Sequence, residues 1–108
     1  MAQKIKFELV VCIVNAGFSQ NVVEAARAAG ARGGTIIRGR GSANPEEAEF
    51  FGVTIQPDKE IVLCLVPESI KDDVLHAIYQ ESGLNQEGQG IAFSLPVERT
   101  TTVRMEEQ

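Results

Sequence analysis

The strongest constraint on the fold is the order in which strand-like and helix-like segments follow each other. Residues 5–14 alternate and then become wholly apolar, which predicts a strand covered on both faces in its second half. A helix is expected from Ser19, its predicted cap, to a left-handed stop at Gly30, because apolar residues recur between them at three- and four-residue steps. Residues 35–37 then predict a short β-branched strand between two glycine clusters.

The second half of the chain predicts two more strands and a second helix. Residues 60–66 predict a third, buried strand ended by Pro67, and residues 68–81 predict a helix with one apolar face. A glycine-spaced polar loop over residues 82–90 precedes a fourth strand at residues 91–97. The resulting order, β-α-β-β-α-β, predicts an α+β, ferredoxin-like sandwich, in which an antiparallel four-stranded sheet carries two helices on one face.

Length and charge narrow the class of protein. With 108 residues and neither a repeat nor a linker, we expect one domain over residues 1–108. The longest apolar stretch, residues 9–14, is far shorter than the ~20 residues of a membrane-spanning helix, and the chain start has no secretory pattern. We therefore expect a cytoplasmic protein without membrane insertion. The net charge of −5 disfavours nucleic acid as a partner.

The predicted sheet has a face that the helices do not cover. Because the strands are apolar on both faces, we expect this open face to pack against copies of the same chain. The alternative is a monomer that exposes a modestly apolar face.

Few side chains suggest metal binding or catalysis. Cys12 and Cys64 each lie within an apolar run, which is typical of a buried free thiol, and no cysteine or histidine spacing indicates a metal site. The single histidine, His76, falls opposite the apolar stripe of its predicted helix and should be exposed. We expect neither a metal nor a catalytic residue.

Two glycine-spaced segments, residues 33–41 and 88–90, indicate an anion site. Glycine lets backbone N–H groups approach a ligand closely, and Arg38 and Arg40 add local positive charge to an acidic chain. Phosphate is the ligand that this combination favours. The alternative is that both segments are simple turns, since neither has the spacing of a Walker loop or a Rossmann fingerprint.

Residues 42–52 have no sustained period and predict a mobile, solvated loop. Phe50 and Phe51 are adjacent, so they cannot both face the same core. We expect one to anchor the loop and the other to contact a partner.

Several of these segments together resemble the P-II family of nitrogen-regulatory signalling proteins. They are AGARGGT at residues 29–35, Lys59 before the third strand, GQGIAF at residues 88–93 and LPVE at residues 95–98. The resemblance covers nearly the whole chain and includes the order of elements. It implies a non-enzymatic homotrimer with an adenine nucleotide in each cleft between subunits. It also implies that residues 42–52 form a T-loop that controls a partner, such as a nitrogen-metabolism enzyme or a membrane transporter.

The resemblance also implies individual roles. Gly39 and Gly41 match the base of the T-loop, Gly88 and Gly90 match the loop on the phosphate side, and Lys59 matches a phosphate-binding lysine. Thr35 matches a residue that holds the base or ribose, and Arg104 matches one of two tail arginines. The complete set that we expect to bind the nucleotide is Thr35, Arg38, Gly39, Arg40, Gly41, Lys59, Gly88, Gln89, Gly90 and Arg104.

The chain departs from the family pattern at two cationic positions. Ile91 stands where a phosphate-binding lysine belongs, and Thr102 replaces the other tail arginine. A charge-assisted phosphate contact contributes roughly 1.5 to 3 kcal/mol, so two missing cations weaken triphosphate binding by about two to four decades. We therefore expect ADP or AMP to bind at least as well as ATP.

Two further departures affect regulation. Ala43 stands where the family has a glutamine that coordinates magnesium and helps to bind 2-oxoglutarate, so we do not expect oxoglutarate sensing. The only tyrosine, Tyr79, lies in the second predicted helix rather than in the loop, so we do not expect uridylylation.

Two other functions share this fold. In a CutA-like trimer the glycine segments would be turns and no nucleotide would bind. An acylphosphatase-like hydrolase needs a phosphate-cradling loop with an arginine and an asparagine after the first strand. Residues 15–18 supply Asn15 but no adjacent arginine.

Overall fold

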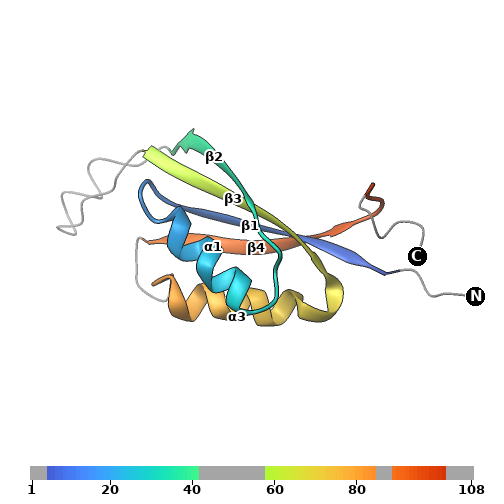
Figure 1. Cartoon of the computed structure of the whole chain (residues 1–108). Coiled ribbons are helices and arrows are strands. Elements are labelled where there is room, and N and C mark those ends of the chain that lie inside the picture. The colour runs from blue at the N-terminus through green and yellow to red at the C-terminus, as the bar shows by residue number, and fades with distance from the viewer. Residues whose placement is uncertain (1–4, 42–57, 85–88, 102–108) are drawn as a thin grey trace, which may run out of the picture.

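The computed structural model describes residues 5–41, 58–84 and 89–101. Its elements follow the predicted order (Figure 1). They are β1 (Phe7–Asn15), α1 (Ser19–Ala28), β2 (Thr35–Arg40), β3 (Asp58–Pro67), the 3₁₀ turn η1 (Glu68–Ile70), α3 (Lys71–Glu81) and β4 (Gly90–Val97). The predicted ferredoxin-like α+β fold is confirmed.

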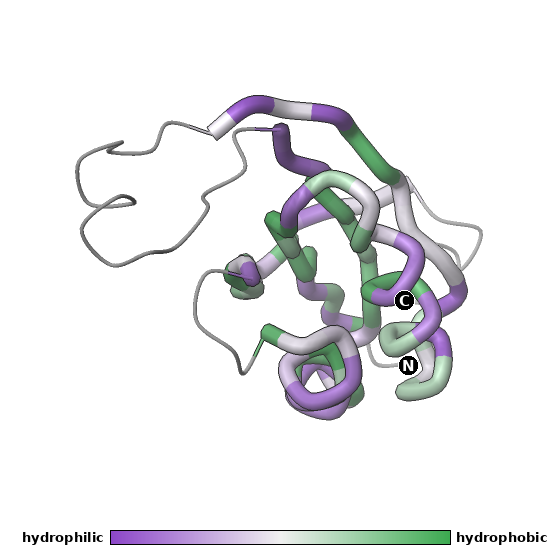
Figure 2. Tube along the Cα trace, turned by 90° about the vertical axis from the view of Figure 1, so that its left-hand side faces the viewer, coloured by the Kyte–Doolittle hydropathy of each residue, from purple (hydrophilic) through white to green (hydrophobic). Residues whose placement is uncertain are grey.

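The four strands form one antiparallel sheet with the order β2-β3-β1-β4. β1 and β3 are therefore central, and β2 and β4 are the edge strands. Figure 2 looks along the strands, and both helices lie on the same side of the sheet. The other face of the sheet is left uncovered by any described element.

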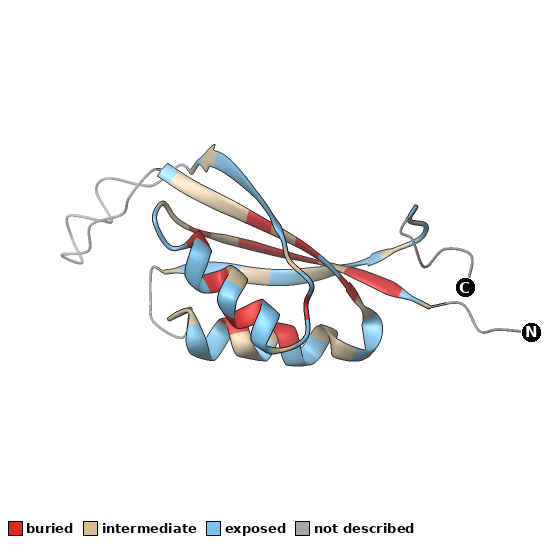
Figure 3. Cartoon of the chain, viewed as in Figure 1, coloured by how far each residue is buried: buried red, intermediate tan, exposed pale blue. Residues whose placement is uncertain are grey.

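The hydrophobic core lies between the sheet and the helices. Successive residues of a strand point to opposite faces, so Val10, Cys12 and Val14 of β1 share the face toward the helices. Buried residues accordingly concentrate in the central strands and on the inner sides of the helices (Figure 3). The other main core residues are Val22, Ala25, Ala26, Val62, Cys64, Val66, Val74 and Ile78.

Cys12 and Cys64 are buried free thiols, as predicted. Burial raises the pKa of the Cys12 thiol to about 12, with the neighbouring Cys64 contributing, and burial also raises the pKa of Cys64. The thiolate, which is the reactive form, is therefore disfavoured in both. His76 is exposed, also as predicted.

The uncovered face of the sheet is apolar. Strand register aligns Leu9, Val11 and Ile13 of β1 with hydrophobic partners on both neighbouring strands. Those partners are Ile61, Leu63 and Leu65 of β3 and Ile91, Phe93 and Leu95 of β4, and Ile37 of β2 extends the row. Several of these side chains remain exposed, with Ile91 at 58% and Leu95 at 49%. The predicted apolar open face is present.

The start of α1 differs from the prediction. Ser19 is not the helix cap: it is buried within the first turn, and the cap position, Phe18, makes no side-chain capping bond. The carboxylate of Glu60 on β3 takes this role instead, because its Oε1 accepts hydrogen bonds from the N–H of Gly17 at 2.6 Å and of Ser19 at 3.4 Å. Gly30, by contrast, has the predicted left-handed backbone, with φ +111°.

Two other element boundaries shift. Residues 68–70 form a 3₁₀ turn before α3 rather than its first α-helical turn, while the N–H of Glu68 bonds to the carbonyl oxygen of Lys6 at 2.8 Å. β2 continues past residue 37 to Arg40 because it stays paired with β3 as far as Asp58.

Among the described residues, no helix is long and apolar enough to cross a membrane.

Replacing Gly90 with alanine should destabilise the fold strongly. Gly90 has φ +151°, and a Cβ there would overlap the carbonyl oxygen of Ile13. We expect Gly90→Ala to lower the free energy of unfolding by about 3 kcal/mol, measured by urea denaturation. The control is Gly83→Ala, which has φ +80° but no atom within 4 Å of the new methyl, and should lose about 1 kcal/mol. Equal losses would show that the close contact with Ile13 does not matter.

Glu60 should make stability depend on pH. Hydrogen bonds from Gly17, and more weakly from Ser19, lower the pKa of Glu60 below its usual 4.5, with nearby Arg38 adding to the effect. The ionised form therefore stabilises the fold above pH 4.5, and this contribution disappears as the pH falls through the lowered pKa. Because Glu60 is partly exposed, we expect Glu60→Gln to cost only about 1 kcal/mol at pH 7. Thermal unfolding at pH 7 and pH 3 tests this, since the difference between the two proteins should be smaller at pH 3 than at pH 7; a constant difference would contradict it.

Candidate functional site

One end of the sheet gathers most of the predicted site residues. The register pairs Asn15 at the end of β1 with Lys59 at the start of β3, and Lys59 with Gly39 near the end of β2. The same register places Gly90, the first residue of β4, opposite Val14. Lys59, Gly39 and Gly90 thus lie at one end of the sheet although they are far apart in the sequence.

Lys59 is the central cation of this end. Its Nζ donates a hydrogen bond to Asn15 Oδ1 at 2.5 Å. Its methylene chain lies against Gly41, since a Cβ at Gly41 would be 3.1 Å from Lys59 Cε. The absence of a side chain at Gly41 therefore leaves room for the lysine stem to cross the end of β2, and the ammonium is held beside the last residue of β1.

Three consecutive residues of β3 hold the turn between β1 and α1. The Asp58 carbonyl oxygen accepts a hydrogen bond from the N–H of Ala16 at 3.0 Å, Lys59 binds Asn15, and Glu60 binds Gly17 and Ser19. The turn is therefore fixed by one backbone and two side-chain connections. Because Lys59 and Glu60 are adjacent in a strand, they use opposite faces of the sheet.

The predicted contacts on β2 divide between these faces. Thr35, Gly39 and Lys59 belong to the uncovered face, because Thr35 pairs with Leu63 and Gly39 pairs with Lys59. Arg38 and Arg40 belong to the face that carries the helices, where Arg38 lies opposite Glu60. The two arginines therefore do not form one row with Lys59, although the sequence grouped them.

Gly90 and Gln89 stand apart from the β2 group. They belong to the opposite edge of the sheet, so about three strand spacings, roughly 14 Å, separate Gly90 from the end of β2. Some predicted residues lie outside the described part of the chain: Phe50, Phe51, Gly88 and Arg104, together with the loop 42–52 and the departures Ala43 and Thr102. Within the described residues, the predicted binding residues fall into two predicted half-sites, one at each edge of the sheet, rather than one closed site.

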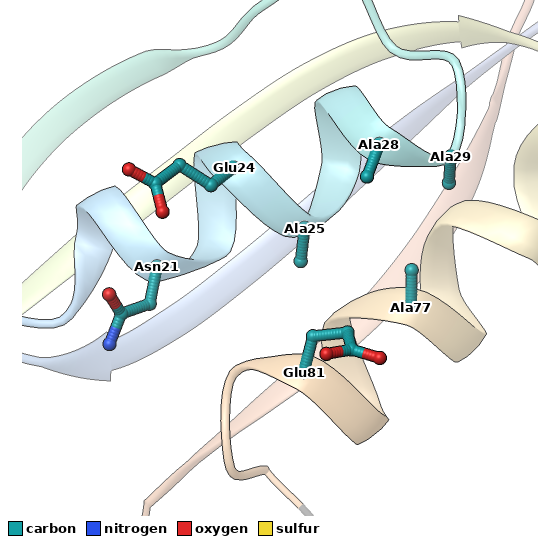
Figure 4. Close-up of a pocket in the computed structure, with 7 residues that line it drawn as sticks. All are labelled: Asn21, Glu24, Ala25, Ala28, Ala29, Ala77 and Glu81. Carbon is teal, nitrogen blue, oxygen red and sulfur yellow. The ribbon is translucent and has the colours of Figure 1, made fainter.

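Neither of the two main pockets contains Lys59. One, of about 440 Å³, lies between α1 and α3 and has a floor of alanines with Asn21, Glu24 and Glu81 around it (Figure 4). The other, of about 460 Å³, lies between α3 and β4 and includes His76, Tyr79, Gly90 and Ile91. In the described residues, no group of three or more histidine, cysteine or acidic side chains could hold a metal ion.

Sequence reasoning missed the roles of Asn15 and Glu60. Asn15 lies 44 positions from Lys59, and Glu60 lies 43 positions from Gly17. No local pattern predicts such pairs. The sequence does contain one weak signal. Residues 15–19 begin and end with a polar residue, which indicates a turn, and the N–H groups of such a turn need hydrogen-bond acceptors.

Comparisons with known proteins bear on this arrangement. The family model described as nitrogen regulatory protein P-II matches residues 7–107. A structure of Arabidopsis thaliana PII bound to citrate shares 26% identity, covers 94% of this chain and 83% of that chain, and has a TM-score of 0.70.

A structure of a PII-like signalling protein from Thermus thermophilus shares 19% identity, covers 86% of this chain and 87% of that chain, and has a TM-score of 0.64. A search of curated proteins finds no significant match. Because the family model spans nearly all of the chain and the fold agrees, the predicted resemblance is confirmed: this chain belongs to the nitrogen regulatory protein P-II family.

Proposed function

We propose that the chain is a cytoplasmic, non-enzymatic signalling protein that binds an adenine nucleotide between the subunits of a homotrimer. In this proposal the loop 42–52 controls a partner, either a nitrogen-metabolism enzyme or a membrane transporter. The observation that carries the proposal is that a glycine- and lysine-containing sheet end adjoins an uncovered apolar sheet face. Membership of a nitrogen-regulatory family supports it.

The apolar face supports self-association. Leu65 of β3 and Phe93 and Leu95 of β4 flank the apolar residues of β1, and each is more than a third exposed. A contiguous apolar surface of this kind is unusual on a monomer and is typical of an interface. Packing against identical subunits would remove these side chains from water.

The division into half-sites supports a ligand position between subunits. The β2 and β4 groups occupy opposite edges of the sheet in one chain. In a closed ring, one edge of each subunit faces the other edge of its neighbour, because a heterologous interface joins two different patches. The β2 edge of one chain and the β4 edge of the next would then hold one ligand.

The donors present fit a phosphorylated ligand. Lys59 supplies positive charge, and Gly41 leaves room for its methylene chain beside the end of β2. Thr35 lies on the same face as Gly39 and four residues away, a separation of about 13 Å along a strand. This row suits an elongated molecule with an anionic end, such as ADP, AMP or ATP.

A different observation counts against an acylphosphatase-like hydrolase. Such an enzyme needs free amides in the loop after β1. Here the N–H groups of Gly17 and Ser19 already bond to the Glu60 carboxylate. A CutA-like trimer without nucleotide binding is separated from our proposal by the binding test below.

Charge on the apolar face should prevent trimer formation. We expect the wild-type chain to run with the mass of three chains in light scattering coupled to gel filtration. Leu95→Glu should yield monomers, because it would bury an unpaired carboxylate at the interface. Ala28→Glu is the control, since Ala28 is also an exposed apolar residue but lies on α1, between the two helices and on the helix side. A monomeric wild type, or a trimeric Leu95→Glu, would contradict the proposed interface.

Nucleotide binding should depend on Lys59 and not on a third phosphate. In titration calorimetry we expect ADP or AMP to bind within tenfold of ATP with magnesium, or more tightly. We expect Lys59→Gln to weaken ADP by about tenfold or more, since it removes a charge-assisted contact. Lys71→Gln on α3 is the matched control and should bind ADP normally. Binding of ATP more than tenfold tighter than ADP would show that Ile91 and Thr102 do not have the expected effect; no binding of any adenine nucleotide would favour the CutA-like alternative.

A further inference from the structure

The acceptor that holds the Lys59 ammonium is electrically neutral. Asn15 Oδ1, an amide oxygen, accepts its hydrogen bond at 2.5 Å. Among the described residues, the ion pair found within 4.0 Å joins Lys71 to Glu8 and does not involve Lys59. The ammonium is therefore placed by a partner that does not cancel its charge.

The nearest carboxylate in sequence is directed elsewhere. Glu60 follows Lys59 directly, and strand alternation puts it on the other face of the sheet. Its Oε1 bonds to the backbone of Gly17 and Ser19 instead. Glu60 thus fills the amide site at the start of α1, which an anionic ligand could otherwise occupy, while Lys59 keeps its full charge on the uncovered face.

We propose that Asn15 is a positioning residue for anion binding, which fixes the ammonium of Lys59 at the sheet end while leaving its charge and its other two N–H donors for a phosphate. This inference rests on the proposed function, because it assumes that the ligand's anionic group reaches Lys59. It adds the end of β1 to a site that otherwise consists of the ends of β2, β3 and β4.

The reason for such a residue lies in the flexibility of lysine. A free lysine side chain loses much rotational freedom when it binds a ligand, and that loss weakens binding. A lysine already held by Asn15 and lying against Gly41 has lost part of this freedom during folding. An aspartate at the same position would hold the ammonium equally well but would neutralise it, so only a neutral acceptor serves both needs.

The experiment compares Asn15→Ala with Asn15→Asp, using ADP in titration calorimetry at several salt concentrations and thermal unfolding of each protein without ligand. We expect Asn15→Ala to weaken ADP binding by about fivefold, because Lys59 regains freedom. We expect Asn15→Asp to weaken ADP binding by about tenfold or more and to make the affinity less dependent on salt, because the cation is neutralised. The melting temperature of Asn15→Asp should stay equal to wild type or rise.

The control is Asn21→Asp, which makes the same change in charge on the exposed surface of α1 and should leave ADP affinity nearly unchanged. If Asn15→Asp bound ADP as tightly as wild type, the positioning role would be overturned. It would also be overturned if, in both Asn15 variants, the loss of ADP affinity only followed a loss of melting temperature. If the wild-type protein itself bound no nucleotide, the proposed function would fail first. The two failures are therefore distinguishable. Should Asn15→Asp not fold, Asn15→Ala decides alone, since unchanged affinity in that variant also overturns the inference.

Discussion

The connection between the start of β3 and the turn after β1 is the constraint on which the sheet end depends. Asp58, Lys59 and Glu60 each bond to a different part of that turn, through a carbonyl oxygen, an ammonium and a carboxylate. This turn also sets where α1 begins, because Glu60 accepts a hydrogen bond from the N–H of Ser19. One short stretch of β3 therefore determines both how the first helix leaves the sheet and where the sheet end carries positive charge.

The two-residue period of a strand lets this stretch serve both purposes. Glu60 faces the helices, where its charge is balanced by backbone N–H groups and by Arg38 across the strand pair. Lys59 faces the other way, beside Gly39 and Gly41. Opposite charges that are adjacent in sequence thus do not neutralise each other. A shift of one residue in the register of β3 would exchange their faces, and it would also turn the apolar row of Ile61, Leu63 and Leu65 toward the helices.

Local patterns were enough to predict the fold, but not the details of the site. The element order, the buried cysteines and the apolar open face follow from periodicity, which depends on nearby residues alone. The capping of α1 did not follow: Ser19 has the residue type of a cap, yet a carboxylate 41 positions away took the role, and the serine became buried. The separation of Arg38 and Arg40 from Lys59 needed the register of β2 with β3, which no single segment encodes. Pairings between distant residues depend on the whole folded sheet, so the sequence reveals them least well.

The position of the half-sites has a consequence for how the proposed regulator would respond. In this proposal a nucleotide bridges the β2 edge of one subunit and the β4 edge of the next, so it binds the assembled form and not the separate chain. Assembly then raises the affinity for the ligand, and binding of the ligand stabilises the trimer. Thermodynamic linkage makes these two free energies equal. A chain with fewer phosphate-binding cations than its relatives would gain less from each nucleotide, so more of the assembly energy must come from the apolar face. Ile91 is strongly exposed and, as the sequence resemblance implies, stands where family members have a lysine. In the proposed trimer it would add to that face and remove a phosphate contact. In this proposal, Ile91 would therefore move the balance from ligand-driven toward contact-driven assembly.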